Sequence, residues 1–157
     1  MEYLTKFKID DLSCANSEFI FILESLHKEE LFERVPAAGE SGHRMRKILF
    51  NKETPLGKLV EKNINATPKI SILNCSRLPL QKSCYHYLEL MPEYLGFLEI
   101  QEIKNENVQI GKNIIKEKLR IKIGLQALQS FWCRLLNNIK NSHTPKIIVC
   151  GLLAQCF

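Results

Sequence analysis

The chain has 157 residues, of which 45% are hydrophobic and 25% are charged. These proportions are those of an ordinary globular protein, and they exclude disordered, collagen-like and coiled-coil chains. A chain of this length buries enough surface to fold without disulfides or metal. We therefore expect one domain over residues 1–157.

The positive charge is concentrated in the C-terminal third of the chain. Residues 111–157 contain eight Lys and Arg but one acidic residue, a net charge of +7, whereas residues 1–110 have a net charge of −2. Such an asymmetry indicates a polyanionic partner, either nucleic acid or an anionic membrane surface.

The two ends of the sequence indicate an intracellular protein. The first residues, MEYLTKFKIDDL, lack the basic and apolar regions of a secretory signal. The longest apolar stretch, residues 147–154, is too short to cross a bilayer, so no membrane span is expected. Six cysteines without a C-x-x-C motif are typical of free thiols in a reducing compartment. We predict a cytoplasmic or nuclear location.

The first quarter of the chain predicts one strand, one helix and one loop. Alternating apolar and polar residues predict a strand over 3–9. Apolar residues at spacings of three and four predict a helix over 16–34. Residues 36–43, with the sequence PAAGESGH, are small and polar and contain two glycines, so they predict a mobile loop.

The middle of the chain predicts alternating short strands and helices. Proline residues mark most of the boundaries, because proline starts helices well and interrupts them when it lies inside. The expected strands are residues 46–50, 69–75 and 97–103, and the expected helices are residues 55–63 and 79–91.

The clearest element is a long helix over residues 111–141. An apolar stripe at helical spacing runs along it, and Trp132 lies within this stripe, which places it in the core. The apolar run of residues 147–150 then predicts a buried strand. Strands and helices thus alternate loosely, so we predict an α+β, or loosely α/β, fold with a small sheet covered by helices.

The basic residues of the predicted long helix are the first candidate binding site. Such side chains can contact phosphates or carboxylates, and the contacts weaken as salt concentration rises. Helical spacing distributes them around the helix, so a solvent-exposed helix face is the alternative interpretation. The candidate residues are Lys112, Lys116, Lys118, Arg120 and Lys122.

A second candidate site comes from a resemblance. The sequence TPLGKL, residues 54–59, together with Arg46 upstream and Glu89 in the sequence YLELMP, resembles segments of the chorismate lyase and UTRA ligand-binding group. The resemblance implies a ligand pocket in which Arg46 holds a carboxylate and Glu89 handles a proton.

Cofactor sites have little support in the sequence. Cys75, Cys84 and His86 are the main group of soft ligands, but a structural zinc site needs a fourth ligand and a short spacing between cysteines. No phosphate-binding glycine motif is present. We therefore predict no metal and no cofactor.

The sequence favours an interaction or regulatory domain over an enzyme. In this hypothesis the basic C-terminal region binds nucleic acid or an acidic protein surface. Two alternatives stay open. One is a small-ligand or lyase-like domain that uses Arg46 and Glu89. The other is a structural subunit of a complex, in which a partner covers the apolar C-terminal residues 147–157.

Overall fold

Three parallel strands form the centre of the fold in the computed structural model, which describes residues 2–51, 53–63, 67–86, 88–103 and 108–157. The strands are β1 (Phe19–Ser25), β2 (Ile70–Ser76) and β3 (Lys146–Val149). Their order in the sheet is β2-β1-β3, so the first strand is the central one. The predicted fold class is confirmed: a small sheet is covered by helices.

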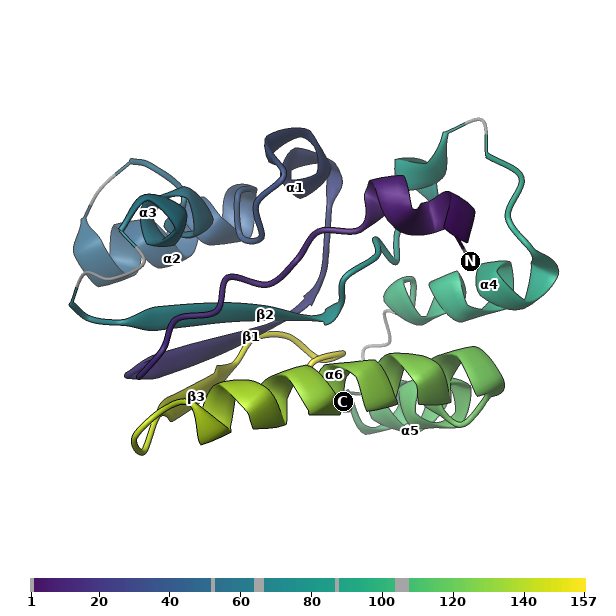
Figure 1. The fold of residues 1–157 in the computed structure, drawn as a ribbon. Helices are drawn as coiled ribbons and strands as arrows, with labels where there is room; N and C mark the ends of the chain where they lie inside the picture. Colours follow the sequence, from purple (N-terminus) through teal and green to yellow (C-terminus); the bar gives the residue numbers. More distant parts are fainter. Residues whose placement is uncertain (1, 52, 64–66, 87, 104–107) are drawn as a thin grey trace.

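Helices cover the sheet on both faces (Figure 1). The connection from β1 to β2 contains α1 (Lys28–Glu33), α2 (Glu40–Phe50) and α3 (Leu56–Lys62). The connection from β2 to β3 contains α4 (Pro92–Leu98), α5 (Val108–Leu119) and α6 (Lys122–Lys140). Crossovers between parallel strands are right-handed, and the two connections run in opposite directions across the sheet. They therefore lie on opposite faces, with α2 and α3 on one and α6 on the other (Figure 1).

The central strand β1 is buried on both faces. Ile20 and Ile22 pack with Phe131 and Leu135 of α6. Phe21 and Leu23 face the other way and join a second cluster, which includes residues of α3 and β2. The sequence of a strand that is covered on both faces is a continuous apolar run, because neither face needs polar residues.

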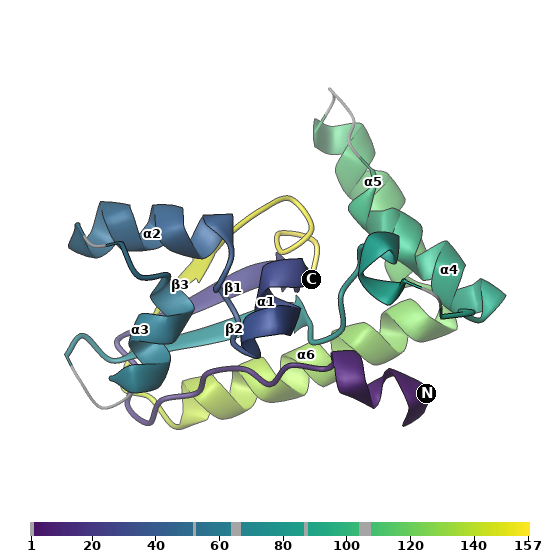
Figure 2. The same ribbon diagram turned by 90° about the horizontal axis from the view of Figure 1, so that it is seen from above.

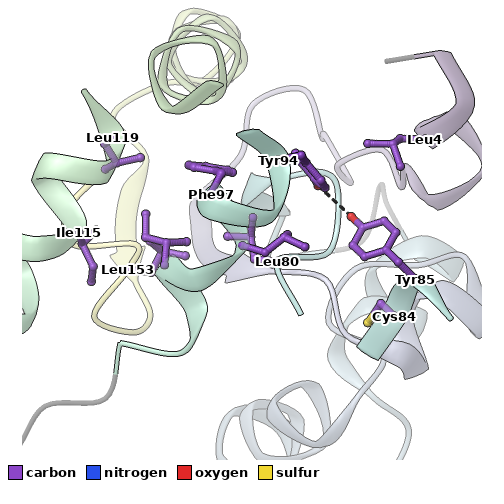
Figure 3. Close-up of a cluster of buried hydrophobic side chains, with 11 residues drawn as sticks. Leu4, Leu80, Cys84, Tyr85, Tyr94, Phe97, Ile115, Leu119 and Leu153 are labelled. Atoms are coloured by element: carbon purple, nitrogen blue, oxygen red, sulfur yellow. Dashed lines mark hydrogen bonds between the residues drawn. The ribbon is translucent and has the colours of Figure 1, made fainter. Parts of the chain in front are cut away.

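A third apolar cluster lies beyond the end of the sheet (Figure 3). It brings together residues from three short 3₁₀ helices and their neighbours: Glu2–Phe7, Lys82–Tyr85 and Glu99–Gln101. At its centre the hydroxyl groups of Tyr85 and Tyr94 lie 2.9 Å apart, and the Tyr85 hydroxyl donates to the Pro79 carbonyl at 2.6 Å. These bonds satisfy two buried hydroxyl groups, so the rings can lie in an apolar interior.

Two predictions in the first quarter of the chain are wrong. Residues 3–9, predicted as a strand, contain most of a 3₁₀ helix. Residues 16–34, predicted as one helix, contain β1 and the short helix α1. The run Phe19-Ile-Phe-Ile-Leu23 is rich in aromatic and β-branched residues, which favour a strand, and its burial on both faces removes the alternation that marks an exposed strand.

The short predicted elements in the middle of the chain were identified in part. The helix over 55–63 and the strands over 69–75 and 147–150 are confirmed as α3, β2 and β3, to within a residue at each end. The prediction that the last of these strands is buried is wrong, because β3 lies at the edge of the sheet and Ile147 and Val149 are exposed. Residues 46–50 belong to α2 and residues 97–103 to the end of α4 and a 3₁₀ turn, so neither is a strand. The predicted helix over 79–91 is not found: the described residues of this range, all but 87, contain the 3₁₀ helix Lys82–Tyr85, and α4 begins at Pro92.

Residues 36–43, predicted to form a mobile loop, are instead a buried turn followed by the first turn of α2. Ala37 and Ala38 are 1% and 5% exposed. The small residues are needed for close packing: a Cβ atom on Gly57 would lie 1.7 Å from the Pro36 carbonyl oxygen, and the Gly57 amide donates to Ala37 at 3.1 Å. The turn therefore docks directly on the backbone of α3.

The long helix predicted over 111–141 is two helices. α5 ends at Leu119 and α6 begins at Lys122. Gly124 allows this break, because a Cβ atom there would lie 2.5 Å from the Lys118 carbonyl oxygen, where the start of α6 crosses the end of α5. The 19 residues of α6 still form the long amphipathic C-terminal helix that the sequence predicts.

We predict that Gly57→Ala destabilises the fold by about 1–3 kcal/mol or more, because the added methyl group forces α3 away from the turn at Pro36. Gly96→Ala is the matched control. It also lies inside a seven-residue helix, and a Cβ atom at Gly96 meets nothing within 4 Å. This second change should stabilise α4 by about 0.5–1 kcal/mol. Urea unfolding followed by circular dichroism measures both. Equal stability of Gly57→Ala and the unaltered protein would contradict the docked turn.

Candidate interaction surface

One flank of α6 exposes large apolar side chains. Leu125, Trp132 and Leu136 are 54%, 47% and 48% exposed, although Phe131 and Leu135 beside them are buried. Residues at spacings of four and seven lie along one line of a helix. The apolar arc of α6 is thus wider than the part that the sheet covers. Trp132, predicted to lie in the core, is half exposed.

This apolar flank faces β3. The opposite, polar flank carries Arg134, which donates to the Asp11 carboxylate and to the carbonyl oxygens of Asn74 and Cys75 at 2.9 and 3.1 Å. These contacts fix the polar flank against the β2 side of the sheet. The exposed apolar flank is therefore directed to the other side of β1, where β3 lies.

β3 exposes apolar side chains to the same side. Ile147 and Val149 are 44% and 43% exposed. In the parallel pairing with β1 they stand beside Ile20 and Ile22, whose side chains point at α6. On this face α6 packs against β2 and β1, and Figure 2 shows it along the β2 side of the sheet, with β3 on the other side of β1.

The outer edge of β3 is also open. The amides of Lys146 and Cys150 donate to Glu18 and Ile22 at 2.9 and 2.8 Å, so alternate backbone groups of the strand face β1. The amide and carbonyl groups of Ile147 and Val149 then point the other way. No strand of the described residues pairs with that edge. An open edge beside exposed apolar side chains is a template for binding another chain.

The last residues pack at one end of this region. The Trp132 indole nitrogen donates to the Phe157 carbonyl at 3.0 Å, and the Phe131 and Phe157 rings meet edge to face with centroids 5.8 Å apart. The Glu24 carboxylate accepts the Leu153 amide at 2.9 Å. These contacts hold the C-terminal segment against α6 and orient the Trp132 ring. We define the C-terminal apolar surface as Leu125, Trp132, Leu136, Ile147 and Val149.

The part of this surface on β3 lies within residues 147–157, which one alternative from the sequence assigns to a partner. Sequence reasoning missed the part on α6, although the sequence contains a signal of it. Apolar residues occur in adjacent pairs along α6, at Phe131 and Trp132 and again at Leu135 and Leu136. Adjacent positions differ by about 100° around a helix. Such pairs therefore mark an apolar arc too wide for one contact, whereas a single stripe is enough for a helix on a sheet.

The structure does not gather the five predicted basic residues on one face. Lys112 and Lys116 lie one turn apart on α5, close to Cys156 in the C-terminal segment. Burial raises the pKa of the Cys156 thiol, and the positive charges of these two lysines oppose that rise. Arg120 and Lys122 are exposed where α5 meets α6.

Lys118 is engaged within the fold. It forms an ion pair with Glu99 and donates to the Gly96 carbonyl at 3.1 Å, which joins α5 to α4. The hydrogen bond and the charge of Lys118 lower the pKa of Glu99 below its usual value. Lys118 is consequently less available to an external anion than the other four.

Arg46 and Glu89 are not brought together. Arg46 lies on α2 and lines a hollow with residues of α3 and the start of β2. Glu89 is exposed and lines a different hollow, beside Tyr85 and Leu95 in the third cluster. The paired Arg and Glu that the resemblance implied therefore share no cavity.

The described residues contain no disulfide and no group of side chains that could hold a metal ion. None of the six cysteines, all of which lie in described parts of the chain, forms a disulfide. Over the described ranges, three or more His, Cys, Asp or Glu side chains nowhere come close enough to hold a metal ion. Within the same ranges, no helix is both long enough and apolar enough to span a membrane.

Comparison with known proteins adds no relative. No protein-family model, curated protein or solved structure matches this chain.

The exposure of the C-terminal apolar surface is testable with two adjacent leucines. Leu135 is 4% exposed and Leu136 is 48% exposed. We predict that Leu135→Ala lowers the free energy of unfolding by about 2–5 kcal/mol, because it opens a cavity between α6 and the sheet. Leu136→Ala should change it by about 0.5 kcal/mol or less. Urea unfolding distinguishes them. A similar large loss in both variants would mean that Leu136 is also packed.

Proposed function

We propose that this chain is a non-enzymatic interaction domain that binds an acidic, amphipathic segment of a partner protein on the C-terminal apolar surface. The single observation that carries the proposal is that α6 and β3 together present five large apolar side chains that are about half exposed. Apolar side chains exposed in this way, with polar residues around them, mark protein interaction sites.

The open edge of β3 favours an extended partner segment. Added strands gain affinity from main-chain hydrogen bonds, and alternate side chains of the added strand provide specificity. Here the backbone groups of Ile147 and Val149 supply the hydrogen bonds. The flank of α6 with Trp132 and Leu136 supplies an apolar wall for every second side chain of the partner.

The border of the surface is basic, which favours an acidic partner. Lys140 lies one helical turn after Leu136, in the last turn of α6. Lys112 and Lys116 lie near the C-terminal segment at the other end. A second copy of this chain would bring an equally basic border. Charge complementarity therefore favours a different protein with acidic flanks.

An acidic protein explains this surface better than nucleic acid does. Phosphate recognition needs positive side chains along one groove or face. The five basic candidates lie in separate places, and Lys118 is paired with Glu99. A nucleic acid also offers no main-chain groups to the edge of β3. Binding of nucleic acid is the alternative outcome of the test below.

The proposal includes a location inside the cell, in the cytoplasm or nucleus. Its support is chemical: the six thiols form no disulfide in the described chain, and Cys133 is exposed on α6. An exposed thiol is stable where the surroundings are reducing.

The proposal predicts binding of a peptide with alternating Val and Glu residues. Trp132 is the one tryptophan of the sequence, so its emission reports directly on this surface. Binding should shift the emission to shorter wavelength, because the indole leaves water, and should weaken between about 50 and 200 mM salt. The double variant Lys116→Glu with Lys140→Glu should weaken binding by about tenfold or more.

Two controls make the result specific. Lys47→Glu with Lys62→Glu changes the net charge equally but lies on the opposite side of the sheet, in α2 and α3, and should leave affinity unchanged. A peptide of alternating Val and Lys should bind much more weakly. Steep, salt-dependent binding of a mixed-sequence DNA duplex, without binding of the acidic peptide, would overturn the proposal in favour of nucleic acid. Binding of neither probe would also contradict it.

A further inference from the structure

A hollow lies where α4 meets the end of α5 and the start of α6 (Figure 2). Its volume is about 690 Å³, which is within the usual range of small-molecule sites. Residues of all three helices line it, from Met91 just before α4 to Gln126 in the second turn of α6. None of the lining residues belongs to the C-terminal apolar surface.

The walls of the hollow are mainly apolar. Ile123 is half-buried and packs against the third apolar cluster, so the core of this end of the molecule lies directly behind the hollow. Met91 and Ile121 line the same hollow and are 43% and 44% exposed. The hollow therefore offers a ligand large apolar side chains that the described chain leaves open to solvent.

Gly96 keeps one wall of the hollow open. It lies inside α4, where a glycine weakens the helix. Its φ is not in the left-handed region, since Gly151 is the one described glycine with a positive φ. A Cβ atom at position 96 would meet nothing within 4 Å. Neither the backbone nor the packing therefore requires a glycine here, whereas the close approach of a ligand to the backbone is a reason for one.

The charges around the hollow balance one another. The Lys118 ammonium lies 2.5 Å from the Glu99 carboxylate, so its charge is already compensated. Glu93 and Lys122 also line the hollow, and both are exposed and form no salt bridge with a described residue. One acid and one base give no net charge, so the hollow favours neither an anion nor a cation. Gln126 adds a neutral amide, which can both donate and accept hydrogen bonds.

We infer that this hollow binds a small neutral amphiphile, whose hydrocarbon body packs on Met91, Ile121 and Ile123 and whose polar end bonds to the Gln126 amide. Burial of apolar surface supplies the affinity, and one hydrogen-bonding group orients the ligand. The site is separate from the C-terminal apolar surface, because residues 126 and 132 point about 120° apart around α6.

The first test is a titration of the full chain with 1-octanol, followed by NMR of the methyl groups. Millimolar 1-octanol should shift the methyl resonances of Met91, Ile121 and Ile123 until they saturate. Octanoate and octylammonium have hydrocarbon chains of the same length with opposite charges, and both should bind more weakly. Tighter binding of either ion at these methyl groups, or no saturable shift with 1-octanol, would overturn the inference.

Filling the hollow gives the second test. Gly96→Leu places a side chain in the hollow, and α4 should tolerate it because a Cβ atom there meets nothing within 4 Å. The variant should stay folded and lose the response to 1-octanol. Gln129→Leu is the matched control, since Gln129 is exposed on α6 and does not line the hollow, and its response should persist. Unchanged octanol binding by a folded Gly96→Leu variant would rule out this site.

A surface variant makes the test independent of how well Gly96→Leu folds. Ile121 is the N-cap of α6, a position that favours serine, so Ile121→Ser should fold and should weaken octanol binding by about fivefold or more. Leu125→Ser, at a similarly exposed position one turn later, should weaken binding of the acidic peptide but not of 1-octanol. The two binding sites can thus fail separately. Equal octanol affinity of Ile121→Ser and the unaltered protein would contradict the inference.

Discussion

The burial of β1 on both faces is the constraint from which the rest of the structure follows. Ile20 is fully buried, and Phe21 and Ile22 are each 4% exposed. A strand of this kind needs a neighbour at each edge and a layer of helices on each side. The order β2-β1-β3 meets the first need, and α3 and α6 meet the second. β3 completes the central strand, yet one of its own faces and its outer edge stay uncovered.

The same constraint places both candidate sites around α6. Because the two connections lie on opposite faces, the α2–α3 layer and α6 never meet across the sheet. The start of α6 borders the hollow at Gly96 beside α4, and another flank of the helix carries most of the C-terminal apolar surface. One flank thus offers an apolar hollow without net charge, and the other offers an apolar wall beside an open strand. Such different surfaces suit a small neutral molecule and a protein segment respectively.

The sequence predicted best the elements whose local pattern matches their surroundings. α3 has a proline at its start and one buried side, and β2 is a short apolar run between turn residues, so both were identified closely. β1 was predicted as helix because burial on both faces hides the period of two. Residues 36–43 were predicted as a loop because small residues serve flexibility and close packing alike, and the sequence does not distinguish these uses.

The candidate sites were less predictable than the fold, because they depend on contacts between distant segments. The sequence shows five basic residues between Lys112 and Lys122 but not the pairing of Lys118 with Glu99, which comes from another helix. It shows Gly96 but not the hollow beside it, which residues of three helices line. The exposure of Trp132 depends on which part of the sheet α6 covers, and that is decided by Arg134 on the opposite flank.

Amide hydrogen exchange along β3 tests the central claim most directly. The amides of Lys146 and Cys150 donate to the Glu18 and Ile22 carbonyls and should exchange slowly. Those of Ile147 and Val149 face the open edge and should exchange faster by orders of magnitude, then become protected when the peptide of alternating Val and Glu is added. Equal protection of all four amides in the free protein would contradict the account, because the edge would then already be covered.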